Sequence, residues 1–243
     1  MIERSCSELP SHGPTLPWAG WAFCALIVLL GGTPANARAT IYARAPIDHY
    51  RMVSRVAEIT LARSAAPPSI SNHARILVLG AHGYDTAVAG ENGFVCLVVR
   101  SWDQGFDNAE FWSPRIRSPE CFNPPAARSV LPRYLERTNW VLAGESTVQM
   151  RAREQAASAA GKLADPETGS FCYMLSQDGY TGDRAAGPWY PHMMFFQDTT
   201  PAAQWGANLP GVLVAANSSS YRGVTFFMVI VPQWSNGAWL AHK

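Results

Sequence analysis

Short runs of apolar residues, separated by glycine, proline and polar turns, predict that much of this chain forms β-strands. The predicted strands span residues 74–79, 84–89, 93–102, 171–176, 191–196, 211–216 and 224–231. Apolar residues recur at helical spacing between Asp48 and Arg63, before Pro67 and Pro68 prevent the helix from continuing. The pattern favours an α+β domain with an N-terminal helix and a mainly antiparallel sheet of about five to seven strands.

Two further helices are predicted between the early and the late strands. The first runs from about Val130 to Ala143 and ends at Gly144, and the second begins with the capping box formed by Ser146 and Gln149. Paired helices of this kind also occur in DNA-binding proteins, but 19 basic against 18 acidic residues predict no basic surface for nucleic acid. We therefore interpret the pair as an inserted helical hairpin on the surface, and expect no nucleic-acid partner.

Turn and loop residues organise the first half of the predicted sheet. The residues Glu91, Asn92 and Gly93 predict an antiparallel hairpin between the strands at 84–89 and 93–102. From residue 103 to 127, aromatic residues alternate with prolines, which predicts an ordered connection without regular secondary structure. Long connections of this kind often carry function, so this segment is a candidate part of a binding site.

The N-terminal segment has the pattern of a secretory signal peptide, because an apolar run over residues 18–32 is followed by the small residues Ala35 and Ala37. A membrane-spanning helix needs about 20 apolar residues, so a retained anchor fits this run less well. We expect cleavage after Ala37, a flexible lead-in over residues 38–46 and a single domain over residues 47–243. The 243 residues, 48% of them hydrophobic, suffice for one sizeable core. The mature protein is then periplasmic or extracellular, without a membrane span.

Three cysteines, Cys96, Cys121 and Cys172, remain after removal of this leader. In an oxidising compartment they permit one disulfide bond and one free thiol. Cys121 is placed in the proline-rich connection, where a cross-link is useful, and the other two lie in predicted strands. We expect Cys121 to pair with Cys96 or with Cys172, and the sequence does not distinguish these two partners.

The stretch from residue 169 to 198 holds the densest set of candidate site residues. One hypothesis is a small hydrolase or thiol enzyme, with Cys172 as the nucleophile, His192 as the base and Asp183 as the orienting acid. Such chemistry requires a thiolate within hydrogen-bond reach of an imidazole. Alternative members of the same arrangement are Cys96, His82, Asp85 and Asp178. A mid-strand cysteine is more often an inert core residue, which weighs against this hypothesis.

The other hypothesis is an envelope or periplasmic binding or accessory module with an aromatic-lined cleft. Directional polar groups among aromatic side chains are typical of pockets for small molecules. The candidate ligand-binding residues are Trp112, Asp178, Tyr180, Trp189 and Tyr190. A glycosidase-like pair of acids from the same loop is a third interpretation. The expected partner is a small-molecule or cell-envelope ligand, and no cofactor or metal is predicted, because His82, Asp85, Asp183 and His192 lack the spacing of metal ligands.

Five further segments are distinctive: GFVCLVVRSW (93–102), ECFNPPAARSVLP (120–132), SFCYMLSQDGY (170–180), WYPHMMFF (189–196) and WGANLPG (205–211). Together they resemble segments of a family of uncharacterised exported bacterial proteins. The resemblance implies a single exported domain. Since that family has no assigned activity, no functional residue is transferred from it.

Overall fold

One mixed, mostly antiparallel sheet organises the part of the chain that the computed structural model describes, which is residues 42–182, 189–212, 214–221 and 224–240. Its eight strands are β1 (Arg75–Gly80), β2 (Gly83–Val88), β3 (Val95–Val99), β4 (Ser118–Phe122), β5 (Phe171–Met174), β6 (His192–Asp198), β7 (Val214–Tyr221) and β8 (Val224–Ile230). They follow the order β2-β1-β3-β4-β5-β6-β8-β7. The α+β class is confirmed, whereas the expected five to seven strands is wrong, because the described sheet contains eight.

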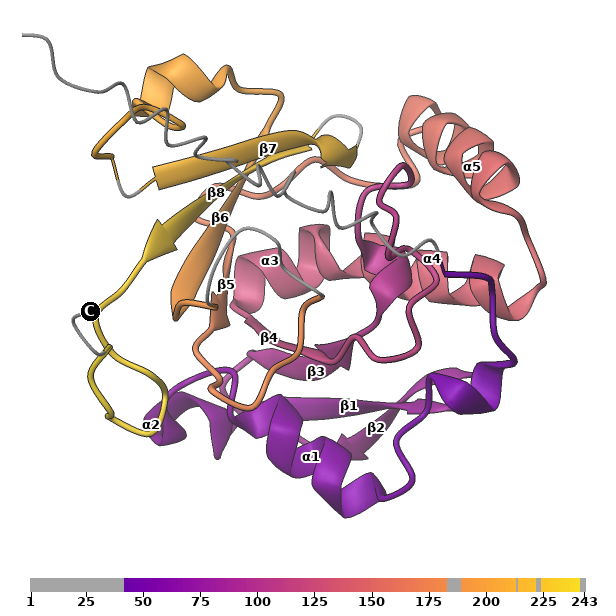
Figure 1. The fold of residues 1–243 in the computed structure, drawn as a ribbon, viewed down its shortest axis with the longest axis horizontal. Helices are drawn as coiled ribbons and strands as arrows, with labels where there is room; N and C mark the ends of the chain where they lie inside the picture. Colours follow the sequence, from indigo (N-terminus) through magenta and orange to yellow (C-terminus); the bar gives the residue numbers. More distant parts are fainter. Residues whose placement is uncertain (1–41, 183–188, 213, 222–223, 241–243) are drawn as a thin grey trace, which may run out of the picture. The chain divides into compact units, whose positions relative to one another are not determined.

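Helices lie on both faces of the sheet (Figure 1). They are α1 (Arg55–Arg63), α2 (Pro68–Ser71), α3 (Pro124–Ser129), α4 (Leu131–Leu142) and α5 (Thr147–Ala159), with the 3-10 turns η1 (Ile47–His49), η2 (Ser101–Asp103) and η3 (Ala202–Trp205). Helix α1 packs on β1, β3 and β4, while α3 packs on β4 and β5. The predicted capping box is present at the start of α5, which buries only Met150 and Glu154 along its length.

The first two strands correct the predicted hairpin. Strand β2 pairs antiparallel with β1, not with β3, and β3 runs parallel to β1 on its other side. The connection between β1 and β2 is tight, with Gly80 facing Gly83, and Gly83 has a positive φ of 121° that suits a glycine. The real turn is therefore Ala81-His82, and residues 89–94 form a longer connection to β3.

The segment 103–127 is also more regular than expected, since it contains β4 and the start of α3. Proline disfavours a central strand because it cannot donate a ladder hydrogen bond. Pro119 is accommodated because β4 pairs along its whole length with β3 but with β5 only through Cys121 and Phe122. Cys121 consequently lies in a strand and not in a loop.

The disulfide bond links Cys96 and Cys121, which face each other across β3 and β4. This selects one of the two pairings that the sequence left open, and Cys172 is the free, buried thiol. The bond lies on the α1 side of the sheet, where Cys96, Cys121 and Val98 pack with Ala62 of α1.

The opposite side of the sheet carries the larger core. There, β3, β4, β5 and β6 contribute Leu97, Phe122, Cys172 and Phe196, which pack with Tyr134 of α4. The two faces alternate along each strand, as expected for a sheet covered on both sides. One face therefore holds the disulfide and α1, and the other has α3 and α4 beside it.

The predicted signal peptide, its cleavage point and residues 38–41 of the lead-in lie outside the described residues. The described residues belong to one compact unit. In the described parts of the chain, none of the helices has the length and apolarity needed to cross a membrane.

Candidate functional site

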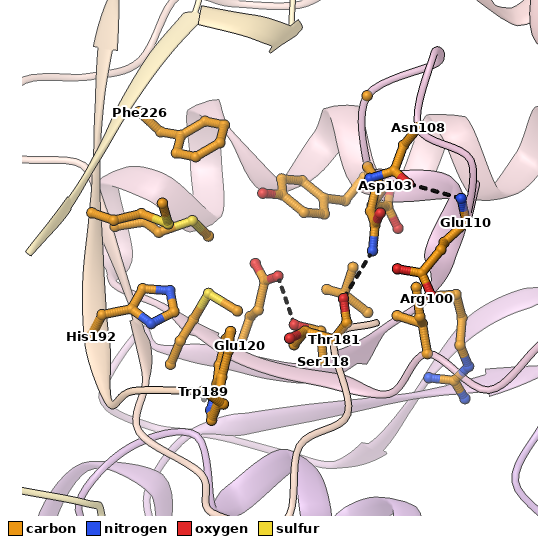
Figure 2. Close-up of a pocket in the computed structure, with 18 of the residues that line it drawn as sticks. Arg100, Asp103, Asn108, Glu110, Ser118, Glu120, Thr181, Trp189, His192 and Phe226 are labelled. Atoms are coloured by element: carbon orange, nitrogen blue, oxygen red, sulfur yellow. Dashed lines mark hydrogen bonds between the residues drawn. The ribbon is translucent and has the colours of Figure 1, made fainter. Parts of the chain in front are cut away.

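A cavity of about 560 Å³ lies on the α4 side of the sheet. Figure 2 shows its arrangement: His192 and Phe226 come from β6 and β8 on one side, Asp103, Asn108 and Glu110 face them, and Glu120 projects between the two sides. The β6 and β8 side is mainly apolar and also includes Met194 and Met228. The cavity therefore has one apolar wall and one wall of carboxyl and amide groups.

The register of the sheet explains why Glu120 and His192 face the same space. Glu120 lies opposite Leu97 of β3, and His192 lies opposite Met174 of β5. Both Leu97 and Met174 belong to the core on the α4 side. Since neighbouring strands are about 4.8 Å apart, the backbones of β4 and β6, with β5 between them, are separated by roughly 10 Å. Two polar side chains thus face the cavity from alternate strands.

Glu120 is a buried carboxyl, and in the described part of the chain no arginine or lysine is among its contacts. Its side chain is 4% exposed; Ser118 Oγ lies 3.5 Å from Oε1, Cys172 Sγ lies 3.9 Å from Oε2, and Tyr134 also forms a hydrogen bond with it. Burial, and secondarily the charge of Asp103, raise its pKa to about 8, although these hydrogen bonds act in the opposite direction. The carboxyl is consequently protonated in most molecules at neutral pH.

Asp103, at the end of η2, is the second buried acid of the cavity. Burial raises its pKa well above the ordinary value, while the nearby Arg137 guanidinium lowers it and Glu154 raises it. Because the charges of Asp103 and Glu120 each disfavour ionisation of the other, the two acids resist carrying negative charge at the same time. This wall can donate as well as accept hydrogen bonds.

Arginines near the cavity are engaged with the protein itself. Arg100 donates from Nε to the carbonyl oxygen of Tyr50 at 2.7 Å, from Nη1 to that of Val98, and from Nη2 to Glu58 Oε1 at 2.7 Å. Figure 2 shows its guanidinium turned away from the cavity. Among the described lining residues Arg100 is the sole arginine or lysine, so the cavity presents carboxyl groups without a basic group directed at them.

His192 is held with one ring nitrogen directed into the protein. Its Nδ1 lies 2.9 Å from the carbonyl oxygen of Tyr190, so Nδ1 carries the hydrogen and donates it. In the neutral ring, Nε2 is then the acceptor. The Trp189 ring meets the imidazole edge-on at 4.7 Å, and Trp189 Nε1 donates to the carbonyl oxygen of Ser176 at 3.1 Å. Both rings are therefore held by contacts within the protein.

Of the predicted ligand-binding residues, Trp189 lines the cavity. The other four lie outside its described lining. Tyr190 is partly exposed and contributes its carbonyl group to His192, and Asp178 is exposed. Tyr180 forms a β-bridge with Arg117 and lies under the guanidinium of Arg115, and the Trp112 ring packs against Phe111.

The predicted thiol site is only partly assembled. His192 lines the cavity and Cys172 lies beside Glu120, but Asp183 falls outside the described residues. Burial and the neighbouring Glu120 raise the pKa of the Cys172 thiol well above its usual value, which opposes thiolate formation. Cys96, the alternative nucleophile, is bonded to Cys121 in the disulfide and has no free thiol. Within the described ranges, no group of three or more His, Cys, Asp or Glu is arranged to hold a metal ion.

Glu120 and Asp103 are the main site residues that the sequence patterns did not single out. The signal for Glu120 was present, because Ser118, Glu120 and Phe122 alternate with Pro119 and Cys121. Had this run been assigned to a strand, the alternation would have placed a carboxyl on the same face as Phe122. Asp103 has no such local signal.

A scan against protein-family models, a search of curated proteins and a search of solved structures each found no match to this chain. The resemblance to exported bacterial proteins stays a prediction. The function of the protein is therefore inferred from the cavity and its chemistry.

Proposed function

We propose that the protein binds a small amphipathic molecule in this cavity. The observation that carries the proposal is Glu120, a buried carboxyl that projects between an apolar wall and a polar wall. The cavity volume of about 560 Å³ falls within the range of roughly 300–1,000 Å³ that is usual for ligand pockets. The apolar part of the ligand packs beside Trp189 and Phe226, and its polar part reaches Glu120 and Asp103.

The sequence also predicted a binding module, but the cavity proposed here is lined by different residues from most of those predicted. Trp189 remains a ligand contact, while the polar contacts come from β4 and η2 and not from Asp178. Because the apolar leader predicts export, we place this binding outside the cytoplasm. The ligand is then a small molecule of the envelope or the surrounding medium.

A fragment screen by nuclear magnetic resonance tests the proposal. We expect fragments with one apolar and one polar end to shift the resonances of cavity residues. Replacing Trp189 by alanine removes an apolar contact and should weaken these fragments at least about tenfold, as loss of a buried aromatic contact is worth more than 1.4 kcal/mol. Trp239→Ala is the matched control, because Trp239 is exposed and outside the cavity lining. Fragments that bind both variants equally, or a screen without cavity binders, would contradict the proposal.

Acid–base catalysis is a second candidate, favoured by the near-neutral pKa of Glu120 opposite His192. In hydrolysis of an ester or glycoside, His192 Nε2 would accept a proton from the attacking water. Glu120 would give its proton to the leaving oxygen as the carbon–oxygen bond breaks. The products then depart, and proton transfer from the imidazolium to the carboxylate restores both groups.

Alkyl esters and alkyl glycosides suit a test of this second function, because their poor leaving groups need protonation. Glu120→Gln should abolish turnover and Cys172→Ser should retain it. The reverse result, with loss only in Cys172→Ser, would restore the thiol mechanism. Absence of turnover across the panel, with fragment binding intact, would leave binding alone as the function.

A further inference from the structure

We propose that the polar end of the ligand is a protonated amine, and that this ammonium group binds by displacing the proton of Glu120. The inference rests on the proposed binding function and specifies its ligand class. Two observations support it: the distribution of charged groups around the cavity, and the pairing of two other buried carboxyls, Glu58 and Glu154, with buried arginines.

The described charges around the cavity favour a cation. Its lining includes the acids Asp103, Asp107, Glu110 and Glu120, against Arg100 alone among arginines and lysines. Asp107 pairs with Arg151 at 2.6 Å on the exposed rim. Arg100 is fully buried and turned toward Glu58, so it offers its donors to the protein interior. An anionic ligand would therefore meet carboxyl groups, whereas an ammonium group meets acceptors.

Two other buried carboxyls in this fold each form an ion pair with a buried arginine. Glu58 lies 2.7 Å from Arg100, with both side chains almost completely buried. Glu154 lies 2.7 Å from Arg137 in an equally buried pair between α5 and α4. Glu120 is also almost completely buried, but among the described residues its contacts are a hydroxyl, a thiol and a phenol. In place of a guanidinium it has the cavity, so a cation from outside can take the position that arginine holds elsewhere.

Displacement of a proton follows from the groups that face Glu120. These are Ser118 on its own strand, Asp103 of η2, Tyr134 of α4, Cys172 of β5 and, across the cavity, His192 of β6. Burial, and secondarily the charge of Asp103, raise the pKa of Glu120 to about 8. An adjacent ammonium group favours the carboxylate and lowers that pKa. Binding therefore releases a proton below about pH 8, and affinity rises up to tenfold per pH unit until that pH is reached.

Isothermal titration calorimetry with phenethylamine and 2-phenylethanol tests this inference. The two probes have similar shape, but only the amine is charged between pH 6 and 8. Titrations at pH 6, 7 and 8, each in two buffers with different ionisation enthalpies, measure affinity and proton release together. For the wild type, we expect the amine to bind more tightly as pH rises, with a buffer-dependent enthalpy, and the alcohol to show neither effect.

Glu120→Gln separates this carboxyl from Asp103, which also resists ionisation. At pH 6, amine binding to the variant should release about one proton fewer than binding to wild type, and the affinity for the amine should be lower. The affinity for the alcohol should stay within about twofold of wild type. Asp178→Asn, an exposed acid outside the cavity lining, is the matched control and should behave as wild type. Circular dichroism of each variant establishes that it is folded.

The outcomes distinguish this inference from the function on which it rests. If the alcohol binds as tightly as the amine, or if proton release is the same in Glu120→Gln, the amine inference is overturned and ligand binding stands. Tighter binding of 3-phenylpropionate than of phenethylamine would overturn it in the same way. If none of the probes binds the folded wild type at millimolar concentration, both the inference and the proposed function fail.

Discussion

Replacing Glu120 by glutamine should change how the stability of the protein depends on pH. The pKa of this carboxyl is about 8 in the folded chain, against an ordinary value of 4.5. Between these two values, the folded state holds a proton that the unfolded state has released. The free energy of unfolding therefore falls as pH rises through this window, and it levels off above about pH 8.

The magnitude follows from the size of the shift. One pKa unit corresponds to about 1.4 kcal/mol, so ionisation of Glu120 lowers the free energy of unfolding by roughly 5 kcal/mol between pH 4.5 and pH 8. Glutamine has a similar shape and no proton to release in this range. Relative to wild type, Glu120→Gln should gain about 3 kcal/mol between pH 5.5 and pH 7.5. Asp103 adds a slope of the same sign, but it remains in both proteins.

Urea denaturation at pH 5.5, 6.5 and 7.5, followed by circular dichroism, measures this difference. The informative quantity is the change in the stability gap between the two proteins, because the amide can shift the absolute stability at every pH. Asp178→Asn is the control and should follow the wild-type pH profile, since Asp178 is exposed. If the profiles of wild type and Glu120→Gln run parallel, Glu120 ionises normally and the account of the cavity is wrong.

Three further predictions concern the ion pair, the free thiol and the leader. Glu58→Ala should lower the free energy of unfolding by about 3–5 kcal/mol in urea denaturation, because it leaves the buried Arg100 without its carboxylate; Glu91→Ala, at an exposed pair, should change it by less than about 1 kcal/mol. Cys172 should resist iodoacetamide at pH 8 until the protein is denatured, as read by mass spectrometry, and labelling of the native protein would contradict its burial. Mass spectrometry of the exported protein should find Arg38 as its first residue, and a retained leader would refute the predicted cleavage.

The strands that the sequence predicted well are those specified by local pattern. The runs that become β5, β6 and β8 are bounded by turn residues and pair in antiparallel order. The strand predicted over residues 211–216 instead begins at Val214 and continues to Tyr221, because the polar residues after 216 extend its pairing with β8. Pairing of β2 was mispredicted because two turn signals flank it, one at residues 80–83 and one at 90–93. Local residues do not reveal that the first turn closes a hairpin and the second leads to a strand on the far side of β1.

Strand β4 was not predicted, for a different reason. The prolines at 114, 119 and 124 indicated an irregular connection, although Ser118, Glu120 and Phe122 alternate as in a strand. The cost of a proline in a strand depends on which neighbouring strand needs its missing donor. Here β5 reaches only Cys121 and Phe122, and this pairing is a property of the whole sheet.

The cavity-lining residues that the sequence patterns named individually are close to each other in the chain. Trp189 and His192 stood out in an aromatic-rich stretch, and both line the cavity. Their partners Asp103 and Glu120 arrive from segments some 70 residues or more away in the chain, through a strand order in which β5 separates β4 from β6. Because such proximity arises from topology, the sequence named individual residues in the aromatic half of the cavity, but indicated the acidic half only as the segment 103–127.

The stability that the fold loses when the buried Glu120 ionises is itself an argument for a functional role of this residue. An apolar residue at this position, between Leu97 and the β5 core residues, would spare the protein a buried carboxyl that opposes folding as it ionises. The fold compensates Glu58 and Glu154 with buried arginines but leaves Glu120 facing a cavity. Stability is commonly sacrificed where a site needs a strained or poorly solvated group. A ligand that supplies positive charge would stabilise the ionised protein, so bound phenethylamine should raise the unfolding temperature more at pH 8 than at pH 6. An increase that is equal at both pH values would show that binding of the amine does not depend on ionisation of Glu120.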